Sequence, residues 1–279
     1  MGVIIMVDFF RILHSEILKL WYMKATRIVI LLVTILQSGL AYISAMQILA
    51  VGLDATPETC SDLVGALPPL EYMGFDVVGF VTIPLIVLGS IYGAGEYKRH
   101  SMRTTLLSTC KKEMVFASKL LLITMFSFLL SFLSIFITIT VTHATFGAQG
   151  LKLFAFNPQV WEFIIVGTIG LMLLTVLSFV IGFLFRNSIV SMLFLIPQVY
   201  NLGNVLAEHF YICRFLPVPL VNRLIASSES IFSSQPVTTI AFICLWILVI
   251  GIMAFTRFFI CDIGGYCSQI GIFGTENTV

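Results

Sequence analysis

The chain has 279 residues, of which 59% are hydrophobic and only 10% are charged, and its formal net charge is +1. Its mean hydropathy of +1.06 is too high for a water-soluble domain and is typical of a polytopic membrane protein. So little polar sequence excludes a separate soluble catalytic domain, and the near-neutral net charge gives no sign of nucleic-acid binding.

The segment before the first long apolar run, Asp8–Lys24, predicts an amphipathic helix. Its apolar residues recur at helical spacing, and its basic residues lie off that stripe; the apolar set is Phe9, Ile12, Leu13, Ile17, Leu20 and Trp21. We expect this helix to lie in the inner membrane interface, either as a plain anchor or as part of a coupling mechanism. Residues 1–24 lack the apolar core and cleavage site of a signal peptide, so we expect them to stay attached.

Six segments are long and apolar enough to cross a membrane as helices. They are Ile28–Leu49, Phe75–Tyr92, Met114–Val141, Phe163–Phe185, Ile189–Leu206 and Val237–Phe259. We predict an all-α fold, because backbone groups in hydrocarbon must be satisfied within each segment and no β-barrel alternation occurs. Pro84 and Pro197 are expected to kink the second and fifth spans. The prediction is one transmembrane domain over 1–279, with a cytoplasmic helix (1–27), six spans (28–259) and a cytoplasmic tail (260–279).

The distribution of basic residues predicts the orientation of these spans. If both termini are cytoplasmic, only Lys152, Arg214 and Arg223 of the 15 Lys and Arg residues lie outside. We therefore expect a multi-pass protein of the plasma membrane with both termini in the cytoplasm.

The outer segment Ala207–Pro236 is apolar but broken by prolines, which predicts short helices that dip into the outer leaflet. Cys213 in this segment and Cys60 in the first outer loop could pair in a disulfide or stay free thiols. We expect His143 and His209, near the outer surface, to be solvated and not to share a metal.

Several chemistries are absent from the sequence. It has no phosphate-binding P-loop, no His-Glu-x-x-His zinc site and no Gly-x-Ser-x-Gly nucleophile turn. We therefore predict no catalytic residue, no metal and no ATP hydrolysis by the P-loop mechanism in this chain. The middles of the spans also lack charged residues, which disfavours an ion-coupled transporter or channel, the main alternative to the function inferred below.

Uncharged polar residues do occur within the spans. The third span carries a stripe at helical spacing that we interpret as close helix packing, with a polar substrate lining as the alternative; it consists of Thr124, Ser127, Ser131, Ser134, Thr138 and Thr142. In the fifth span, Asn201 and Asn204 lie beside Pro197 and Gly203, where a broken helix could expose them.

The strongly charged block Gly95–Leu107 separates the second and third spans. We expect Gly93 and Gly95 to end the second helix and the block to form a compact turn or short helix. Such a surface would bind a cytoplasmic partner, or would only fix the topology and contact anionic headgroups.

Four short motifs at these positions resemble those of the ABC-2 family of permeases, the membrane subunits of one class of ABC transporter. They are Ser-Glu-x-x-Lys-Leu at Ser15, Glu16, Lys19 and Leu20; Glu-Tyr-x-x-x-Ser-x-Arg-Thr-x-Leu at Glu96, Tyr97, Ser101, Arg103, Thr104 and Leu106; Ala117-Ser118-Lys119; and Arg186-Asn187-Ser188. With the six spans, the resemblance covers nearly the whole chain.

The resemblance implies an exporter of amphipathic or hydrophobic substrates, such as antimicrobial peptides, drugs or lipids. It implies two cytoplasmic ATP-binding cassette subunits, which bind ATP and Mg²⁺, and a second permease chain, identical or homologous. The coupling helix would comprise Glu96, Tyr97, Lys98, Arg99, Ser101, Met102, Arg103, Thr104 and Thr105. The substrate pathway would include Gln198, Asn201, Asn204 and Phe215, with short re-entrant helices around Phe215–Leu224.

Overall fold

The computed structural model describes residues 2–53, 55, 67–98, 102, 105–106, 112–152, 156–225 and 236–260. Within these ranges the chain is helical and has no strand, which confirms the all-α prediction. The α-helices are α1 (Gly2–Tyr22), α2 (Lys24–Leu31), α3 (Gln37–Val51), α4 (Thr82–Lys98), α6 (Lys112–Phe146), α7 (Pro158–Phe185), α8 (Ser188–Pro197), α9 (Gly203–His209), α10 (Pro217–Ile225) and α12 (Pro236–Ile260). Short π-helical segments (Leu32–Leu36, Gln198–Leu202) and 3₁₀ turns (Leu70–Tyr72, Asp76–Val81, Gly147–Gln149, Tyr211–Phe215) join some of them.

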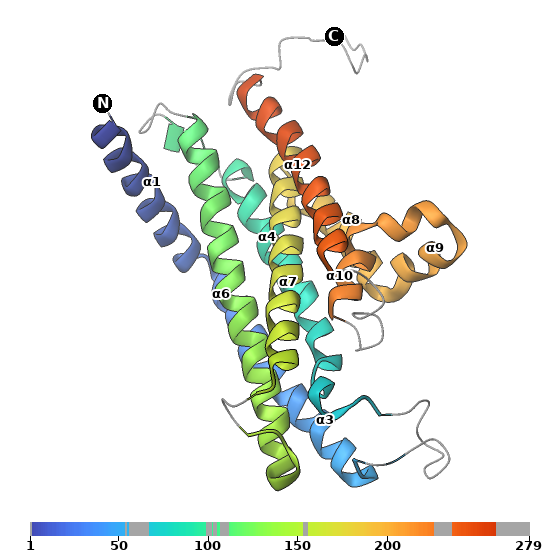
Figure 1. Ribbon diagram of the computed structural model, residues 1–279. Helices are drawn as coiled ribbons and strands as arrows, with labels where there is room; N and C mark the ends of the chain where they lie inside the picture. Colours follow the sequence, from blue (N-terminus) through green and yellow to red (C-terminus); the bar gives the residue numbers. More distant parts are fainter. Residues whose placement is uncertain are drawn as a thin grey trace.

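Five helical stretches among the described residues are long and apolar enough to cross a membrane. They are Lys24–Val51, Leu70–Tyr97, Lys112–Gln149, Pro158–Phe185 and Pro236–Ile260. Such a set is typical of a multi-pass membrane protein. α4, α7 and α12 all end at the end of the bundle where α6 begins, and α1 lies against α6 near it (Figure 1). We call this the α1 end of the bundle.

α7 is the central helix of the bundle. It packs against α4, α6, α8, α10 and α12, and nearly all its residues beyond the first turns are buried. A helix that is apolar and covered on all sides is expected at the core of a helical membrane protein. Of the long helices, α4, α6 and α12 pack against α7 (Figure 1), and α6 and α12 leave apolar residues on their outer faces, as lipid-facing helices do.

Glycines let α4 approach α7 closely. A Cβ added at Gly89 would collide with the Thr175 carbonyl oxygen, and one at Gly93 would collide with that of Phe179. The expectation that Gly93 and Gly95 end the second helix was wrong, because α4 continues through both to Lys98. Gly93 therefore serves close helix packing, as small residues do in membrane proteins.

Pro84 does not lie in the interior of an α-helix, although the second predicted span implied that it would. α4 begins at Thr82 after the 3₁₀ turn Asp76–Val81, so Pro84 lies in the first turn of the α-helix. A first-turn N–H has no partner within the helix, and proline is tolerated there.

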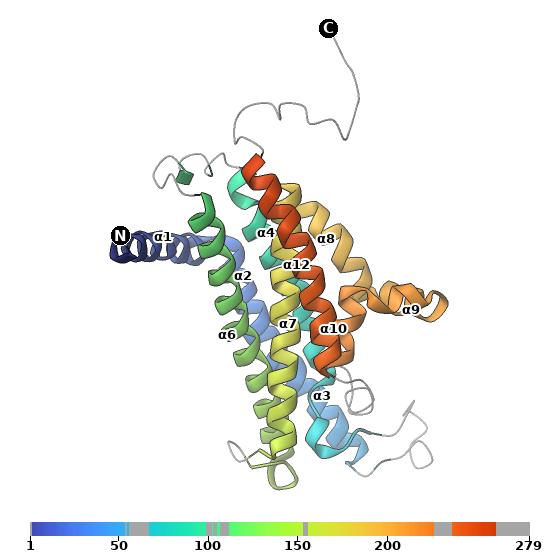
Figure 2. The same cartoon turned by 45° about the horizontal axis from the view of Figure 1, so that its top comes forward.

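The prediction of one continuous fifth span over Ile189–Leu206 is not confirmed, and neither is the count of six spans. α8 ends at Pro197, a π-helical segment follows over Gln198–Leu202, and α9 then begins at Gly203. Pro197 cannot donate a hydrogen bond and so weakens the helix at this point. α8 runs beside α4 and α7, whereas α9 projects sideways from the bundle (Figures 1 and 2).

The polar stripe of the third predicted span lies at a helix contact, as the packing interpretation predicted. Ser127, Ser131, Ser134, Thr138 and Thr142 are buried on α6, which packs against α3. The Ser134 hydroxyl donates to the Val33 carbonyl at 3.2 Å, whereas the hydroxyls of Thr138 and Thr142 bond within their own helix.

The segment after α9 folds back onto the bundle. α10 buries most of its residues against α7 and α12, and Trp246 Nε1 donates to the Phe215 carbonyl at 2.8 Å. Cys213 is a free thiol, and Cys60 lies outside the described residues. His209 is exposed as expected, but the expectation of a solvated His143 was wrong: it is 1% exposed and its Nδ1 accepts from the Leu151 N–H at 3.4 Å.

Candidate functional site: a buried ion-pair cluster

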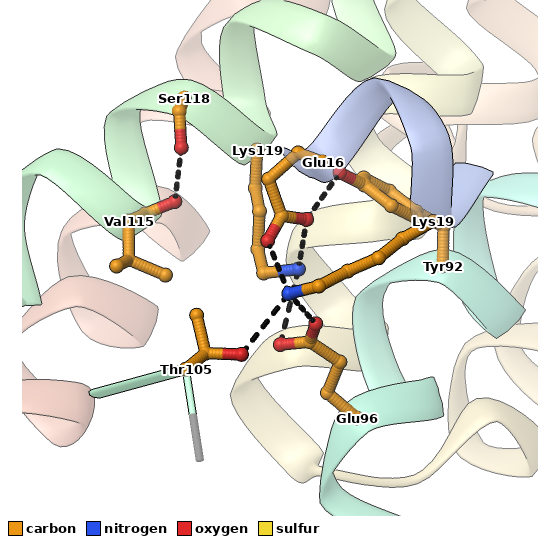
Figure 3. Close-up of polar contacts among 8 residues, drawn as sticks. All are labelled: Glu16, Lys19, Tyr92, Glu96, Thr105, Val115, Ser118 and Lys119. Carbon is orange, nitrogen blue, oxygen red and sulfur yellow. Dashed lines mark hydrogen bonds and ion pairs between the residues drawn. The ribbon is translucent and has the colours of Figure 1, made fainter. Parts of the chain in front are cut away.

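Four charged side chains meet near the α1 end of the bundle (Figure 3). Glu16 pairs with Lys119 at 2.6 Å and with Lys19 at 2.7 Å. Glu96 pairs with Lys19 at 2.7 Å and with Lys119 at 3.2 Å. The four residues come from α1, α4 and α6, so one charge-balanced group joins three helices. We call Glu16, Lys19, Glu96 and Lys119 the ion-pair cluster.

Neutral side chains complete the cluster. The Tyr92 hydroxyl donates to Glu16 at 3.0 Å, and its ring lies 4.9 Å from Lys119 Nζ. Lys19 Nζ donates to the Thr105 hydroxyl at 3.0 Å (Figure 3). Lys19 thus directs its three donors to Glu16, Glu96 and Thr105.

The pattern of α1 explains how a carboxylate comes to be buried here. Ile12, Glu16 and Leu20 follow at intervals of four residues, so they share one face of the helix, and all three are buried against the bundle. The side chains of Glu16 and Lys119 are 1% and 2% exposed. Charges buried to this degree are tolerated when they are paired and hydrogen-bonded.

The electrostatics of α1 favour the charged forms of its two cluster residues. Burial alone would raise the pKa of Glu16, but Lys119 and Lys19 outweigh it and the pKa is lowered. Burial alone would lower the pKa of Lys19, but its hydrogen bonds to Glu16 and Glu96 outweigh it and the pKa is raised. Both residues therefore stay ionised near neutral pH.

Five of the nine residues predicted to contact an ATPase lie in the described part of the chain. Glu96, Tyr97 and Lys98 form the last residues of α4, and the Glu96 side chain, 13% exposed, turns into the ion-pair cluster. Met102 is 1% exposed. The remaining predicted coupling residues, Arg99, Ser101, Arg103 and Thr104, fall outside the described residues.

Tyr97 packs against the neighbouring turn between α7 and α8. Its ring lies 5.3 Å from that of Phe183, and the Arg186 guanidinium lies 5.1 Å above it. Arg186 ends α7 in the left-handed conformation with φ 55°, and the Asn187 side chain accepts from the Ile189 N–H to cap α8. The Arg-Asn-Ser motif thus forms a tight helix–helix turn beside Tyr97.

The candidate substrate-pathway residues lie apart from the cluster. Gln198 is 6% exposed, donates to the Phe194 carbonyl, and keeps its Oε1 buried without a hydrogen-bond partner. Asn201 and Asn204 lie in the π-helical segment and in α9. Phe215 is 37% exposed and packs on Phe242 with ring centroids 4.8 Å apart. No group of three or more His, Cys, Asp or Glu residues in the described part of the chain could hold a metal ion.

The sequence indicated the members of this site separately but did not indicate that they meet. Glu16, Glu96 and Lys119 each belong to one of the motifs described above, yet Glu96 lies 77 residues from Lys19 and Lys119 lies 103 residues from Glu16. One signal pointed to Glu16, namely a carboxylate in the middle of an apolar i, i+4 stripe. Nothing in the sequence indicated that Lys119 is the partner of Glu16.

Comparisons with known proteins add no family to this picture, since no family model, no curated protein and no solved structure matches the chain.

Proposed function

We propose that the chain is the membrane subunit of an ATP-driven exporter of the ABC-2 permease type. It would move an amphipathic or hydrophobic substrate, such as a peptide, a drug or a lipid, with ATP hydrolysed by separate cytoplasmic subunits. It would lie in the plasma membrane with both termini in the cytoplasm and would pair with a second permease chain.

One observation carries the proposal. Three of the motifs that resemble the permease family supply all four members of the ion-pair cluster: Glu16 and Lys19, then Glu96, then Lys119. An ATP-driven permease needs a connection between the loop that receives the motion and the helices that surround the substrate. The cluster is such a connection, because it joins the end of α4 to α1 and α6.

The energetics of the cluster suit this role. Separating buried charges from their partners leaves them unpaired in a medium of low dielectric constant, which costs several kcal/mol. A displacement of the end of α4 is therefore expected to carry α1 and α6 with it instead of breaking the ion pairs. Such an element can bias two conformations of the permease.

The position of the buried charges also favours an external motor over an ion gradient. Among the described residues, the buried Asp, Glu, Lys and Arg side chains are Glu16 and Lys119, both in the ion-pair cluster, and the buried histidine His143 lies in the last turn of α6, apart from the candidate pathway residues. An ion-coupled transporter or channel requires a titratable or charged group along its pathway, where the substrate candidates Gln198, Asn201 and Asn204 are uncharged.

Co-purification tests the proposal. The affinity-tagged chain, extracted from its native membrane in mild detergent, is expected to retain an ATP-binding cassette subunit identifiable by mass spectrometry. Substrate accumulation in inverted vesicles is expected to stop when ATP is depleted and to continue when the ion gradients are collapsed. Recovery of the chain without any ATP-binding subunit, together with transport that survives ATP depletion, would contradict the proposal.

A further inference from the structure

An open pocket of about 610 Å³ lies beside the ion-pair cluster, where α1 meets α2 and both face α4. Its polar wall carries Lys19, Lys24, Lys119 and Glu96, and its remaining wall includes Tyr22 and Ile91. The volume falls within the range of about 300 to 1,000 Å³ that is common for ligand pockets. A pocket with a basic wall and an apolar wall suits a ligand that is itself anionic at one end and apolar at the other.

We propose that this pocket binds the headgroup of an anionic phospholipid, with the lipid phosphate beside Lys24. The inference depends on the chain being a membrane protein and does not depend on the proposed transport function.

The place of the pocket in the fold supports a lipid ligand. Met23 has an extended backbone, with φ −68° and ψ 124°, and separates α1 from the first long apolar stretch, Lys24–Val51. The pocket therefore lies where the first spanning helix enters the membrane. Tyr22 is 71% exposed at the same point, and tyrosine is enriched at the level of the lipid headgroups.

The charges of the wall leave a net attraction for one anion. Glu16 and Glu96 neutralise Lys19 and Lys119 within the ion-pair cluster. Lys24 is exposed and forms no ion pair with the residues that the structure describes. The positive charge of Lys24 is therefore not neutralised by the cluster, and basic pockets between spanning helices bind anionic lipid headgroups through such a charge.

The start of α2 adds to this attraction. Its N-cap residue, Met23, offers no side-chain hydrogen bond, and the N–H groups of Thr26 and Arg27 bond to the Met23 carbonyl. The earlier N–H groups of the turn belong to Lys24 and Ala25, which both line the pocket. Unpaired first-turn N–H groups and the helix dipole both favour a phosphate at such a position.

A lipid titration tests the proposal. The purified, delipidated full chain in detergent is titrated with short-chain phosphatidylglycerol, with short-chain phosphatidylcholine and with inorganic phosphate, and bound ligand is counted by native mass spectrometry. We expect one tightly retained phosphatidylglycerol. Lys24→Gln is expected to weaken its binding on the order of tenfold, because a charge-assisted hydrogen bond is lost.

Two further variants separate the pocket from the general surface. Ala25→Leu adds bulk to the pocket wall without changing charge and is expected to weaken phosphatidylglycerol binding as well. Arg27→Gln removes an exposed basic residue on the same helix that does not line the pocket, and it should change the affinity by less than about twofold.

Three results would overturn the assignment. Phosphatidylcholine that binds as tightly as phosphatidylglycerol would remove the anionic selectivity. An equal loss of affinity in Arg27→Gln and Lys24→Gln would indicate non-specific attraction to the basic surface. Displacement of phosphatidylglycerol by inorganic phosphate at similar concentration would make the ligand a free phosphate and not a lipid.

Discussion

Glu16 Oε2 and Lys119 Nζ lie 2.6 Å apart although 103 residues separate them in the chain. Both side chains are almost completely excluded from the surface. The pair fixes α1, which extends sideways from the bundle in Figure 2, to the spanning helix α6. α1 and α6 are therefore expected to move as one unit.

Removing one member of this pair should destabilise the protein strongly. Lys119→Met leaves the buried carboxylate of Glu16 without its closest counter-charge, and we expect a loss of about 3 kcal/mol or more in the free energy of unfolding. Thermal unfolding in detergent measures this loss. Arg11→Gln, which changes an exposed residue of α1, should leave the unfolding temperature within experimental error.

The double variant Glu16→Gln/Lys119→Met distinguishes a true pair from two separate defects. Its destabilisation should be clearly smaller than the sum of the two single effects, because no buried charge of the pair is left alone. Simple additivity would show that the two residues do not interact.

The pH dependence of stability should follow the ion-pair cluster. Folding lowers the pKa of Glu16 from an ordinary value near 4.5. The stability that Glu16 contributes is therefore fully present above that pH and is lost as the pH falls through the folded pKa. Folding raises the pKa of Lys19 from an ordinary value near 10.5. The stability that Lys19 contributes is therefore fully present below that pH and is lost as the pH rises through the folded pKa. The unfolding temperatures of the wild type and Glu16→Gln should therefore converge as the pH falls from about 4.5 through the lower, folded pKa of Glu16.

The close packing of α4 on α7 predicts opposite effects for two neighbouring glycines. Gly93→Ala places a methyl group against the Phe179 carbonyl, which should cost about 1 to 3 kcal/mol of stability. Gly95→Ala meets nothing within 4 Å and should be neutral or stabilising by up to about 1 kcal/mol, since alanine favours helix. Denaturant unfolding of the two variants tests this. Equal losses in both would refute close packing as the reason for Gly93.

Gln198 lies at the break between α8 and α9, and a substitution there should affect transport without a matching effect on stability. Gln198→Leu removes the hydrogen bond from Nε2 to the Phe194 carbonyl, but it also removes the buried Oε1, which has no hydrogen-bond partner. The two effects oppose each other, so the unfolding temperature should change little. If Gln198 belongs to the substrate pathway, transport by this variant should nevertheless fall. Gln47→Leu, an exposed glutamine on α3, is the matched control and should preserve transport. Wild-type transport by Gln198→Leu would exclude Gln198 from the pathway.

The helical class and most of the long apolar helices were predictable from the sequence, because hydropathy and length alone decide them. The positions of two helix ends could not be predicted correctly from the sequence. Gly93 appeared to end a helix since glycine usually weakens one, but its contact with Phe179 shows that packing against α7 outweighs that preference. Ile189–Leu206 appeared continuous since its hydropathy does not change at Pro197, where the helix breaks.

The members of the candidate site were predictable, but their arrangement was not. The charged block after the second predicted span was expected to form a compact turn or short helix with an accessible charged surface, because charged residues are usually solvated. Glu96 instead faces Lys19 and Lys119, and only contacts between distant parts of the chain determine that. Spacing along α1 puts Glu16 on the same helix face as Ile12 and Leu20 but cannot identify Lys119 as its partner.

The ratio of substrate transported to ATP hydrolysed tests the central claim most directly. It would be measured in vesicles that contain the purified complex, for the wild type, Glu96→Gln, and the control Glu113→Gln, which changes an exposed glutamate at the start of α6. We predict that Glu96→Gln assembles and hydrolyses ATP but loses most of its transport, whereas Glu113→Gln matches the wild type. An unchanged ratio in Glu96→Gln would contradict the account, because the ion-pair cluster would then play no part in coupling.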